Sequence, residues 1–247
     1  MKRPASRSIV RGMSVALLSL SAATLAVWAV TANAGSTGAD AAHPTVVELF
    51  QSQGCSSCPP ANANVMAITD RPDVLALSFQ VTYWDQLGWK DTFASPAYTK
   101  RQYDYANGLR HDGVWTPQVV INGRRDVVGI KRGELDQALA AAQRGTGGPS
   151  VVVTPGHVSV TGSPAHRAAE VWLARYDPRV IQIAIARGEN GGRTLPHRNV
   201  VRELVLLGVW RGPSGAFNLP PAKIPGLREA ILVQDGTGGP ILAATRA

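Results

Sequence analysis

The pattern of apolar and polar positions predicts alternating strands and helices in the first half of the chain. Two short apolar runs rich in β-branched residues, residues 45–50 and 74–81, are typical of buried strands. Between them, residues 58–69 carry apolar positions at helical spacing, and a connection of this length favours parallel pairing of the two strands. Ser95 and Pro96 then open a second helix, because serine caps well and proline suits the first helical position.

The pattern continues with a hairpin and a closing helix. An apolar strand after Pro117 ends at Asn122-Gly123, a pair that favours the type I′ turn of a hairpin, and residues 125–129 form the returning strand. Residues 132–142 are rich in alanine and predict a third helix. The expected order of elements is therefore β, α, β, α, β, β, α.

Residues 145–149 have the composition of a linker, and the pattern beyond them changes to strands separated by turn signals. Ile181, Ile183 and Ile185 alternate with less apolar residues, which is typical of a half-buried strand. The expected strands are 150–154, 157–161, 169–175, 180–186, 200–210, 230–234 and 240–244. Residues 150–247 are therefore expected to form a second, mainly antiparallel β domain, a small sandwich or barrel.

The first 34 residues have the pattern of a signal peptide. Four basic residues precede an apolar stretch over residues 15–30, and Ala32-Asn33-Ala34 has the small-x-small form of a cleavage site. We expect cleavage after Ala34 and export to the periplasm or the extracellular space. The alternative is an uncleaved membrane anchor, although the apolar stretch is short for a membrane span.

Removal of this segment would lower the net charge of the remaining chain. It contains four of the 25 basic residues and none of the 17 acidic ones, so the net charge falls from +8 to +4. The remaining basic residues are scattered, and no nucleic-acid-binding module is recognisable, so we expect no nucleic-acid partner. Export also places the cysteines in an oxidising compartment, where a disulfide persists.

The candidate chemistry lies at the two cysteines of the chain, Cys55 and Cys58, between the first strand and the first helix. A thiol at a helix N-terminus is stabilised as thiolate by unpaired N–H groups and the helix dipole. We expect a redox-active disulfide that needs no cofactor, with Cys55 as the exposed attacking thiol and Cys58 as the more buried resolving thiol. The alternative is a purely structural bridge.

The strand-CxxC-helix arrangement, followed by Thr116-Pro117 before a strand, resembles the thioredoxin superfamily. The resemblance implies a cis bond before Pro117 beside the cysteines, and a Thr116 backbone that binds substrate as an extended chain. It also implies the fold class: an α/β protein with a thioredoxin-like domain over residues 44–146, followed by the β-rich domain over residues 150–247.

A closer resemblance is to a secreted bacterial thioredoxin-like family of uncharacterised function, DUF1223. It implies the fold over nearly all of residues 45–247 but brings no established reaction. Acids or histidines often stand in that family where this chain has Asn62, Gln80 and Thr82. The resemblance is carried by Glu48 to Pro60, Tyr83-Trp84-Asp85, Leu87 to Asp91, Thr116-Pro117-Gln118, Gly188-Glu189-Asn190 and His197 to Leu204.

Three further side chains are candidates with two interpretations each. Glu48 either moves the proton of Cys58 from beneath it, as an acid does in thioredoxin-like proteins, or faces water at the edge of its strand. Trp84 and Trp115 either line a substrate groove or pack within the protein. Residues 187–199 are interpreted as an ordinary connecting loop, with a position facing the cysteines as the alternative.

The function expected from the sequence is thiol–disulfide exchange on an exported protein client or redox partner through Cys55 and Cys58. The first alternative is a binding or assembly module in which the bridge is inert. A Cu(I)-handling protein is a further alternative, but the five histidines show no metal-ligand spacing, and we expect no metal site.

Overall fold

The structure is a computed structural model that describes residues 38–142, 144–163 and 168–247. These residues belong to one compact unit. The expected signal peptide, residues 1–34, lies outside the described residues, so its cleavage stays a prediction. Within the described ranges, none of the helices has both the length and the apolar character needed to cross a membrane.

The first half of the chain contains strands and all the helices of the described residues, and the second half contains strands. In chain order the elements are β1 (Thr45–Gln51), α1 (Cys58–Met66), β2 (Val74–Gln80), α2 (Pro96–Leu109), β3 (Gln118–Ile121), β4 (Arg125–Val127), α3 (Arg132–Ala141), β5 (Ser150–Thr154), β6 (His157–Thr161), β7 (Ala169–Asp177), β8 (Ile181–Ala184), β9 (Thr194–His197), β10 (Val200–Trp210), β11 (Ser214–Asn218), β12 (Arg228–Asp235) and β13 (Ile241–Arg246).

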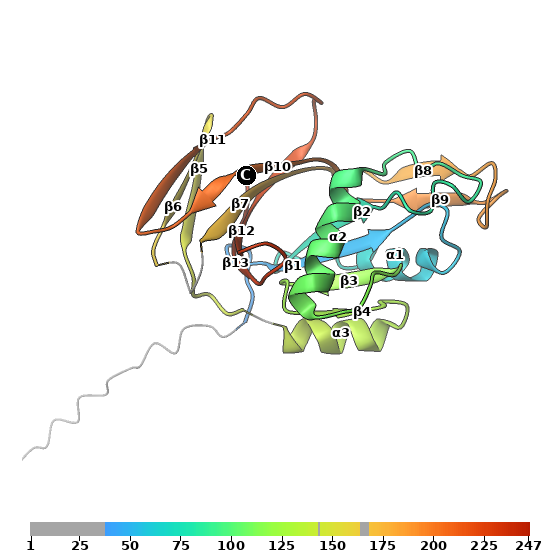
Figure 1. Ribbon diagram of the computed structural model, residues 1–247, viewed down its shortest axis with the longest axis horizontal. Helices are drawn as coiled ribbons and strands as arrows, with labels where there is room; N and C mark the ends of the chain where they lie inside the picture. Colours follow the sequence, from blue (N-terminus) through green and yellow to red (C-terminus); the bar gives the residue numbers. More distant parts are fainter. Residues whose placement is uncertain (1–37, 143, 164–167) are drawn as a thin grey trace, which may run out of the picture. The chain divides into compact units, whose positions relative to one another are not determined.

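A mixed sheet of eight strands forms the centre of the described unit, in the order β13-β12-β7-β10-β2-β1-β3-β4 (Figure 1). β1 pairs with β2 in parallel, as the strand–helix–strand pattern predicts. β3 pairs antiparallel with β1 and returns as β4 through Asn122 and Gly123. The φ angles of these two residues, 49° and 60°, fit the predicted type I′ turn.

β10 connects the two halves of the chain by joining the edge of β2. Val200 and Ser78 form a parallel bridge, and the side chain of Asn199 donates a hydrogen bond to the Ala76 carbonyl at 2.8 Å. β10 then pairs with β7, β7 with β12 and β12 with β13, all antiparallel. The sheet is therefore continuous across the expected boundary near residues 146–150, and the division into two domains stays a prediction.

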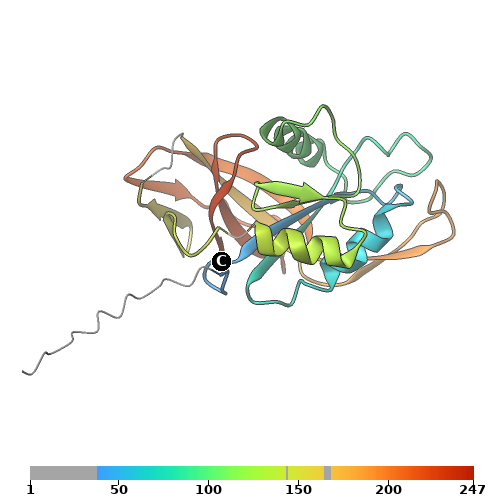
Figure 2. The same ribbon diagram turned by 90° about the horizontal axis from the view of Figure 1, so that it is seen from below.

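Helices cover both faces of the part of the sheet that the first half of the chain forms, with strands β2, β1, β3 and β4 (Figure 2). On one face, Leu49 of β1 packs in a cluster with Val65 of α1 and Leu135 of α3. On the other face, Phe50 packs with Tyr105 of α2, with ring centroids 6.0 Å apart. Neighbouring residues of a strand point to opposite faces, so β1 is buried along its length because both of its faces are covered.

The second half packs as two layers of antiparallel strands. β5, β6 and β11 form a separate three-stranded sheet in the order β11-β6-β5. Val158 and Val160 of β6 share a core cluster with Val171 of β7 and with Ile231 and Val233 of β12. All the strands expected in this half are present, whereas β9 and β11 are additional: both are short, and neither has an apolar alternation strong enough to stand out in the sequence.

A buried ion pair joins β1, α2 and β12. Arg101 of α2 donates to both carboxylate oxygens of Glu48, at 2.7 and 3.2 Å, to the hydroxyl of Tyr105 at 3.0 Å and to the side-chain oxygen of Gln234 at 3.1 Å. The Tyr105 hydroxyl in turn hydrogen-bonds to Glu48. Burial lowers the pKa of Arg101, but the charges of Glu48, Tyr105 and Glu170 and the hydrogen bond to Glu48 together outweigh it, so the net shift is upward and the guanidinium stays charged.

We expect Arg101→Met to destabilise the protein by about 3–5 kcal/mol, because it leaves the Glu48 carboxylate buried without a cation to pair with. The double variant Glu48→Gln with Arg101→Met should lose less than the sum of the two single variants. Urea unfolding at neutral pH, followed by circular dichroism, measures these free energies.

Lys100→Met is the matched control, since Lys100 is the preceding residue of the same helix and pairs with Asp104 at the surface. Its effect should be much smaller. Equal destabilisation by the Arg101 and Lys100 variants would show that the buried pair has no special importance.

Candidate functional site around Cys55 and Cys58

The two cysteines form a disulfide at the N-terminus of α1, with Cα atoms 5.4 Å apart. The chain leaves β1 through a turn in which the Cys55 amide donates to the Ser52 carbonyl at 3.1 Å. A second turn follows, closed by the Cys58 amide and the Cys55 carbonyl at 3.2 Å. Prolines occupy the first turn of α1, where no backbone N–H is needed for the helix. The local pattern of the sequence therefore positions the bridge as expected.

Both cysteines are buried, which corrects the expectation that Cys55 is exposed. The relative exposure is 0% for Cys55 and 1% for Cys58. The exposed residues of the motif are Ser56 and Ser57, between the two cysteines. In this structure a bulky protein thiol therefore has no direct access to either sulfur.

The loop between β8 and β9, residues 185–193, contacts the backbone around Cys55; we call it the cover loop. The side-chain nitrogen of Asn190 donates to the carbonyl oxygens of Gln53 and Cys55, each at 2.9 Å. A carboxylate oxygen of Glu189 accepts a hydrogen bond from the Ser56 amide at 3.1 Å, and hydrogen bonds from Ser56 lower the pKa of Glu189. The interpretation of residues 187–199 as an ordinary connecting loop is therefore wrong.

The predicted substrate-binding residues Thr116, Pro117 and Trp84 lie at the disulfide. The peptide bond between Thr116 and Pro117 is cis, as the resemblance implies. The Ser57 hydroxyl lies 3.5 Å from the Thr116 carbonyl oxygen and 3.4 Å from the sulfur of Cys55. The Trp84 indole donates to the Thr116 hydroxyl at 2.8 Å, which holds this aromatic side chain against the segment before the proline.

Trp115 and Glu48 are not brought to the disulfide by any contact in the described residues. The ring of Trp115 packs edge-on against His111, with centroids 4.9 Å apart. Glu48 points to the face of the sheet that α2 covers, where it pairs with Arg101, whereas α1 and Cys58 lie on the other face. This side-chain direction corrects both interpretations of Glu48: it neither lies beneath Cys58 nor faces water.

A small cavity of about 40 Å³ lies next to Cys58 instead. Gln51 donates to the side-chain oxygens of Asn62, at 2.9 Å, and of Ser78, at 2.8 Å. Asn62 donates to the Pro196 carbonyl at 2.7 Å, which connects α1 to β9. The cavity is lined by Gln51, Ser52, Cys58, Pro59, Asn62, Ala63, Leu195, Pro196 and His197.

His197 is the ionisable group that shares this cavity with Cys58. It is 2% exposed, and neither of its ring nitrogens has a hydrogen-bond partner within the described residues. Burial lowers the pKa of His197 to about 4, so the ring is neutral near pH 7. Its ring centroid lies 6.0 Å from that of Phe93, in an edge-on contact.

Asn190 and His197 are the site residues that sequence reasoning did not select. Asn190 stands in the cover loop and His197 ends the short strand β9, and Asn190 is separated from Cys55 by 135 positions. The sequence feature that could have indicated them is their position in the motifs Gly188-Glu189-Asn190 and His197 to Leu204, which carry the family resemblance. Over the described part of the chain, no cluster of three or more His, Cys, Asp or Glu residues could hold a metal ion.

We expect Asn190→Ala to speed reduction of the disulfide by a phosphine reductant roughly tenfold or more. The variant loses two buried hydrogen bonds of about 1 kcal/mol each, and 1.4 kcal/mol corresponds to a factor of ten in the open fraction of the cover loop. The readout is the rate of thiol release under native conditions. Asn107→Ala, at an exposed position of α2, should leave the rate unchanged; equal rates in all three proteins would mean that the cover loop does not limit access.

We also expect His197 to make the protein less stable in acid. Its folded-state pKa of about 4 lies below the unfolded value of about 6.5, so the unfolded chain binds more protons between these pH values and stability falls as the pH falls. His197→Asn should therefore lose about 2–3 kcal/mol less than the wild type between about pH 7.5 and about pH 4.5.

The control for this measurement is His157→Asn, since His157 is exposed. Asp91 acts in the opposite direction, because burial raises its pKa to about 6 and the stability it contributes is lost as the pH rises from about 3.8 to about 6. Both variants keep Asp91, so its contribution cancels in the comparison. Identical pH profiles for the two variants would contradict a buried, neutral His197.

Comparisons with known proteins identify the chain's relatives. A family model described as a protein of unknown function, DUF1223, matches residues 46–234. Comparison with proteins of curated function gives no match. An X-ray crystal structure of a protein from Agrobacterium tumefaciens is similar, with 31% identity and a TM-score of 0.69 over 84% of this chain and 94% of that chain.

A second solved structure, HBP35 of Porphyromonas gingivalis, is similar in fold alone. Its TM-score is 0.52 at 12% identity, over 85% of this chain and 76% of that chain. The family model covers most of the present chain, including the cysteine motif, the cover loop and β10. The chain therefore belongs to the DUF1223 family, whose function is unknown.

Proposed function

We propose that this protein is an exported thiol–disulfide exchange protein with a thioredoxin-like first half, and that its disulfide reacts when the cover loop moves aside. The observation that carries the proposal is the disulfide at the N-terminus of α1 with the cis Thr116-Pro117 peptide beside it. The strand order β2-β1-β3-β4, with α1 and α3 on one face and α2 on the other, supports the thioredoxin-like assignment.

The proposed reaction transfers two electrons between a client and the cysteine pair. A client thiolate attacks Sγ of Cys55, the bond between Cys55 and Cys58 breaks, and Cys58 leaves as a thiolate that takes up a proton. A second client thiolate then displaces Cys55. The client is oxidised to a disulfide and the pair is reduced to two thiols; the reverse sequence reduces a client disulfide.

The surrounding residues have roles that follow from their positions. The N-terminus of α1 stabilises a cysteine thiolate through its unpaired N–H groups. The ring of His197 lines the cavity beside Cys58 and stays neutral there, because burial lowers its pKa to about 4. The backbone of Thr116 binds the client as an extended segment, and Trp84 borders that position.

A second candidate function is a binding or assembly module in which the bridge is inert. The observation in its favour is the complete burial of Cys55, whose backbone Asn190 fixes to the cover loop. The two candidates differ in whether the cover loop opens under native conditions, because exchange requires a thiolate to approach the sulfur of Cys55.

We expect the wild-type protein to accelerate reduction of insulin by dithiothreitol, and Cys55→Ser to have no such activity. Cys58→Ser should retain clients as mixed disulfides through Cys55, because the resolving thiol is missing. These adducts are detected on non-reducing gels of exported proteins from the host and identified by mass spectrometry.

The combination of Cys58→Ser with Asn190→Ala is the matched control for access, and it should trap more client than Cys58→Ser alone. The exchange function would be excluded by a wild type no more active than Cys55→Ser, together with a reduction potential below about −300 mV, the range of structural disulfides. That outcome would support the inert bridge.

A further inference from the structure

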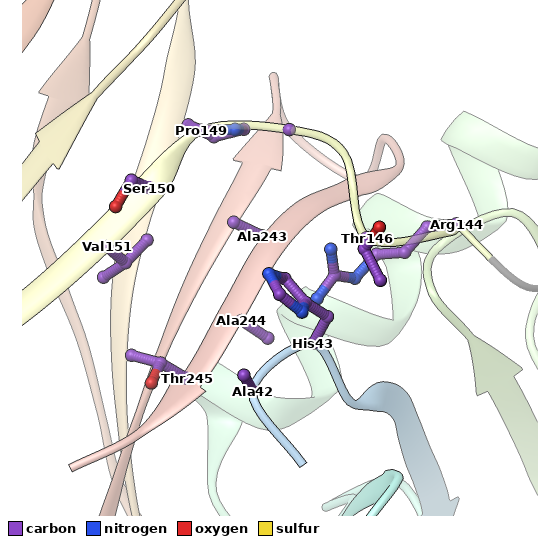
Figure 3. A pocket seen from close by; sticks show the side chains of 11 residues that line it. Ala42, His43, Arg144, Thr146, Pro149, Ser150, Val151, Ala243, Ala244 and Thr245 are labelled. Atoms are coloured by element: carbon purple, nitrogen blue, oxygen red, sulfur yellow. The ribbon is translucent and has the colours of Figure 1, made fainter. Parts of the chain in front are cut away.

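A second cavity, of about 300 Å³, lies away from the cysteines between the linker and β13. Its walls come from the segment before β1, from residues 144–151, and from residues 243–245 of β13. Figure 3 shows the guanidinium of Arg144 and the ring of His43 beside each other at one side of the cavity, with Ala243 and Val151 on the neighbouring strands. A cavity of this size is at the lower end of the range for small-molecule sites.

The guanidinium of Arg144 is the unusual feature of this cavity. Within the described residues its Nε and Nη2 atoms are buried and have no hydrogen-bond partner, and its Nη1 donates to the Leu242 carbonyl at a long 3.4 Å. Burial lowers the pKa of Arg144, and the like charge of Arg124 lowers it further. The side chain as a whole is half-buried, and leaving two buried donors of a cation without partners is costly, so an anion bound there would compensate the charge.

The acidic residue whose charge acts on Arg144 does not provide this compensation. This residue is Asp40. One of its oxygens, however, accepts hydrogen bonds from the backbone amides of Ala42, at 2.9 Å, and His43, at 2.7 Å, and contacts the His43 ring at 3.0 Å. No ion pair between Asp40 and Arg144 is formed. Asp40 therefore orients His43 and leaves the guanidinium donors available.

The rest of the cavity is apolar on one side. Pro149 and Val151 of the linker and β5, together with Ala243 and Ala244 of β13, form this wall. An arginine that offers two donors in a fixed plane matches the two oxygens of a carboxylate. We infer that this cavity binds a small organic carboxylate, with its charged group on Arg144 and a short apolar body against Pro149, Val151 and Ala243. This inference does not rest on the proposed redox function.

Isothermal titration of the purified protein with hexanoate tests the inference. Saturable one-to-one binding is expected for hexanoate, with weaker binding of acetate and inorganic phosphate, which lack the apolar body, and none of hexanol, which lacks the charge. Arg144→Gln should weaken hexanoate binding roughly tenfold or more, because it removes a charge-assisted contact. Arg211→Gln, the same change at an exposed arginine, should bind as the wild type does.

The chemical shift of the Arg144 side-chain Nε–H provides a second measurement on the unaltered protein, should Arg144→Gln fail to fold. Hexanoate should shift this resonance in a saturable way and hexanol should not. Equal binding of hexanol and hexanoate, or hexanoate binding that Arg144→Gln leaves unchanged, would overturn the inference. Tighter binding of inorganic phosphate than of hexanoate would replace the organic carboxylate with a simple oxyanion and would also overturn it.

Discussion

The ion pair between Glu48 and Arg101 determines how α2 lies on the sheet, and the position of the cis peptide depends on that helix. The pair ties α2 to β1 and, through Gln234, to β12 in the second half of the chain. The next residue of the helix, Gln102, donates to the Trp115 carbonyl at 2.7 Å and to the Gln118 side chain at 2.9 Å. These two contacts flank Thr116 and Pro117. The buried ion pair holds α2 on the sheet, and α2 in turn holds the segment that lies at the disulfide.

The disulfide differs from that of an open redox site, because the cover loop contacts the backbone around Cys55. Its contacts with the Cys55 carbonyl and the Ser56 amide are made with backbone atoms, which are present whatever the redox state of the sulfurs. Under the proposed exchange function, a partner that opens the loop to reach Cys55 replaces these contacts with its own, and its apparent affinity is lower the smaller the fraction of molecules in which the loop is open. Selection of a partner can thus lie in displacing the loop as much as in the chemistry of the cysteines.

Features set by short stretches of sequence could be predicted, and features set by distant residues could not. The apolar runs of β1 and β2, the prolines after Cys58 and the Asn122-Gly123 turn each act through neighbouring residues, and the structure confirms what they indicate. The Cys55 carbonyl, by contrast, is bound by Asn190, 135 positions away. The direction of Glu48 depends on which face of β1 each helix covers, and its partner Arg101 lies 53 positions away in a sequence with many arginines.

The bridge from β10 to β2 has a consequence for self-association. β2 is buried along its whole length and mostly apolar, and β10 and Asn199 cover its outer edge at Ser78 and Ala76. An uncovered edge of this composition is a template for pairing with a strand of another molecule. The second half of the chain therefore protects the outer edge of β2 from pairing with a strand of another molecule. Until β10 has been added to the sheet during folding, the half that contains the cysteines remains open to aggregation.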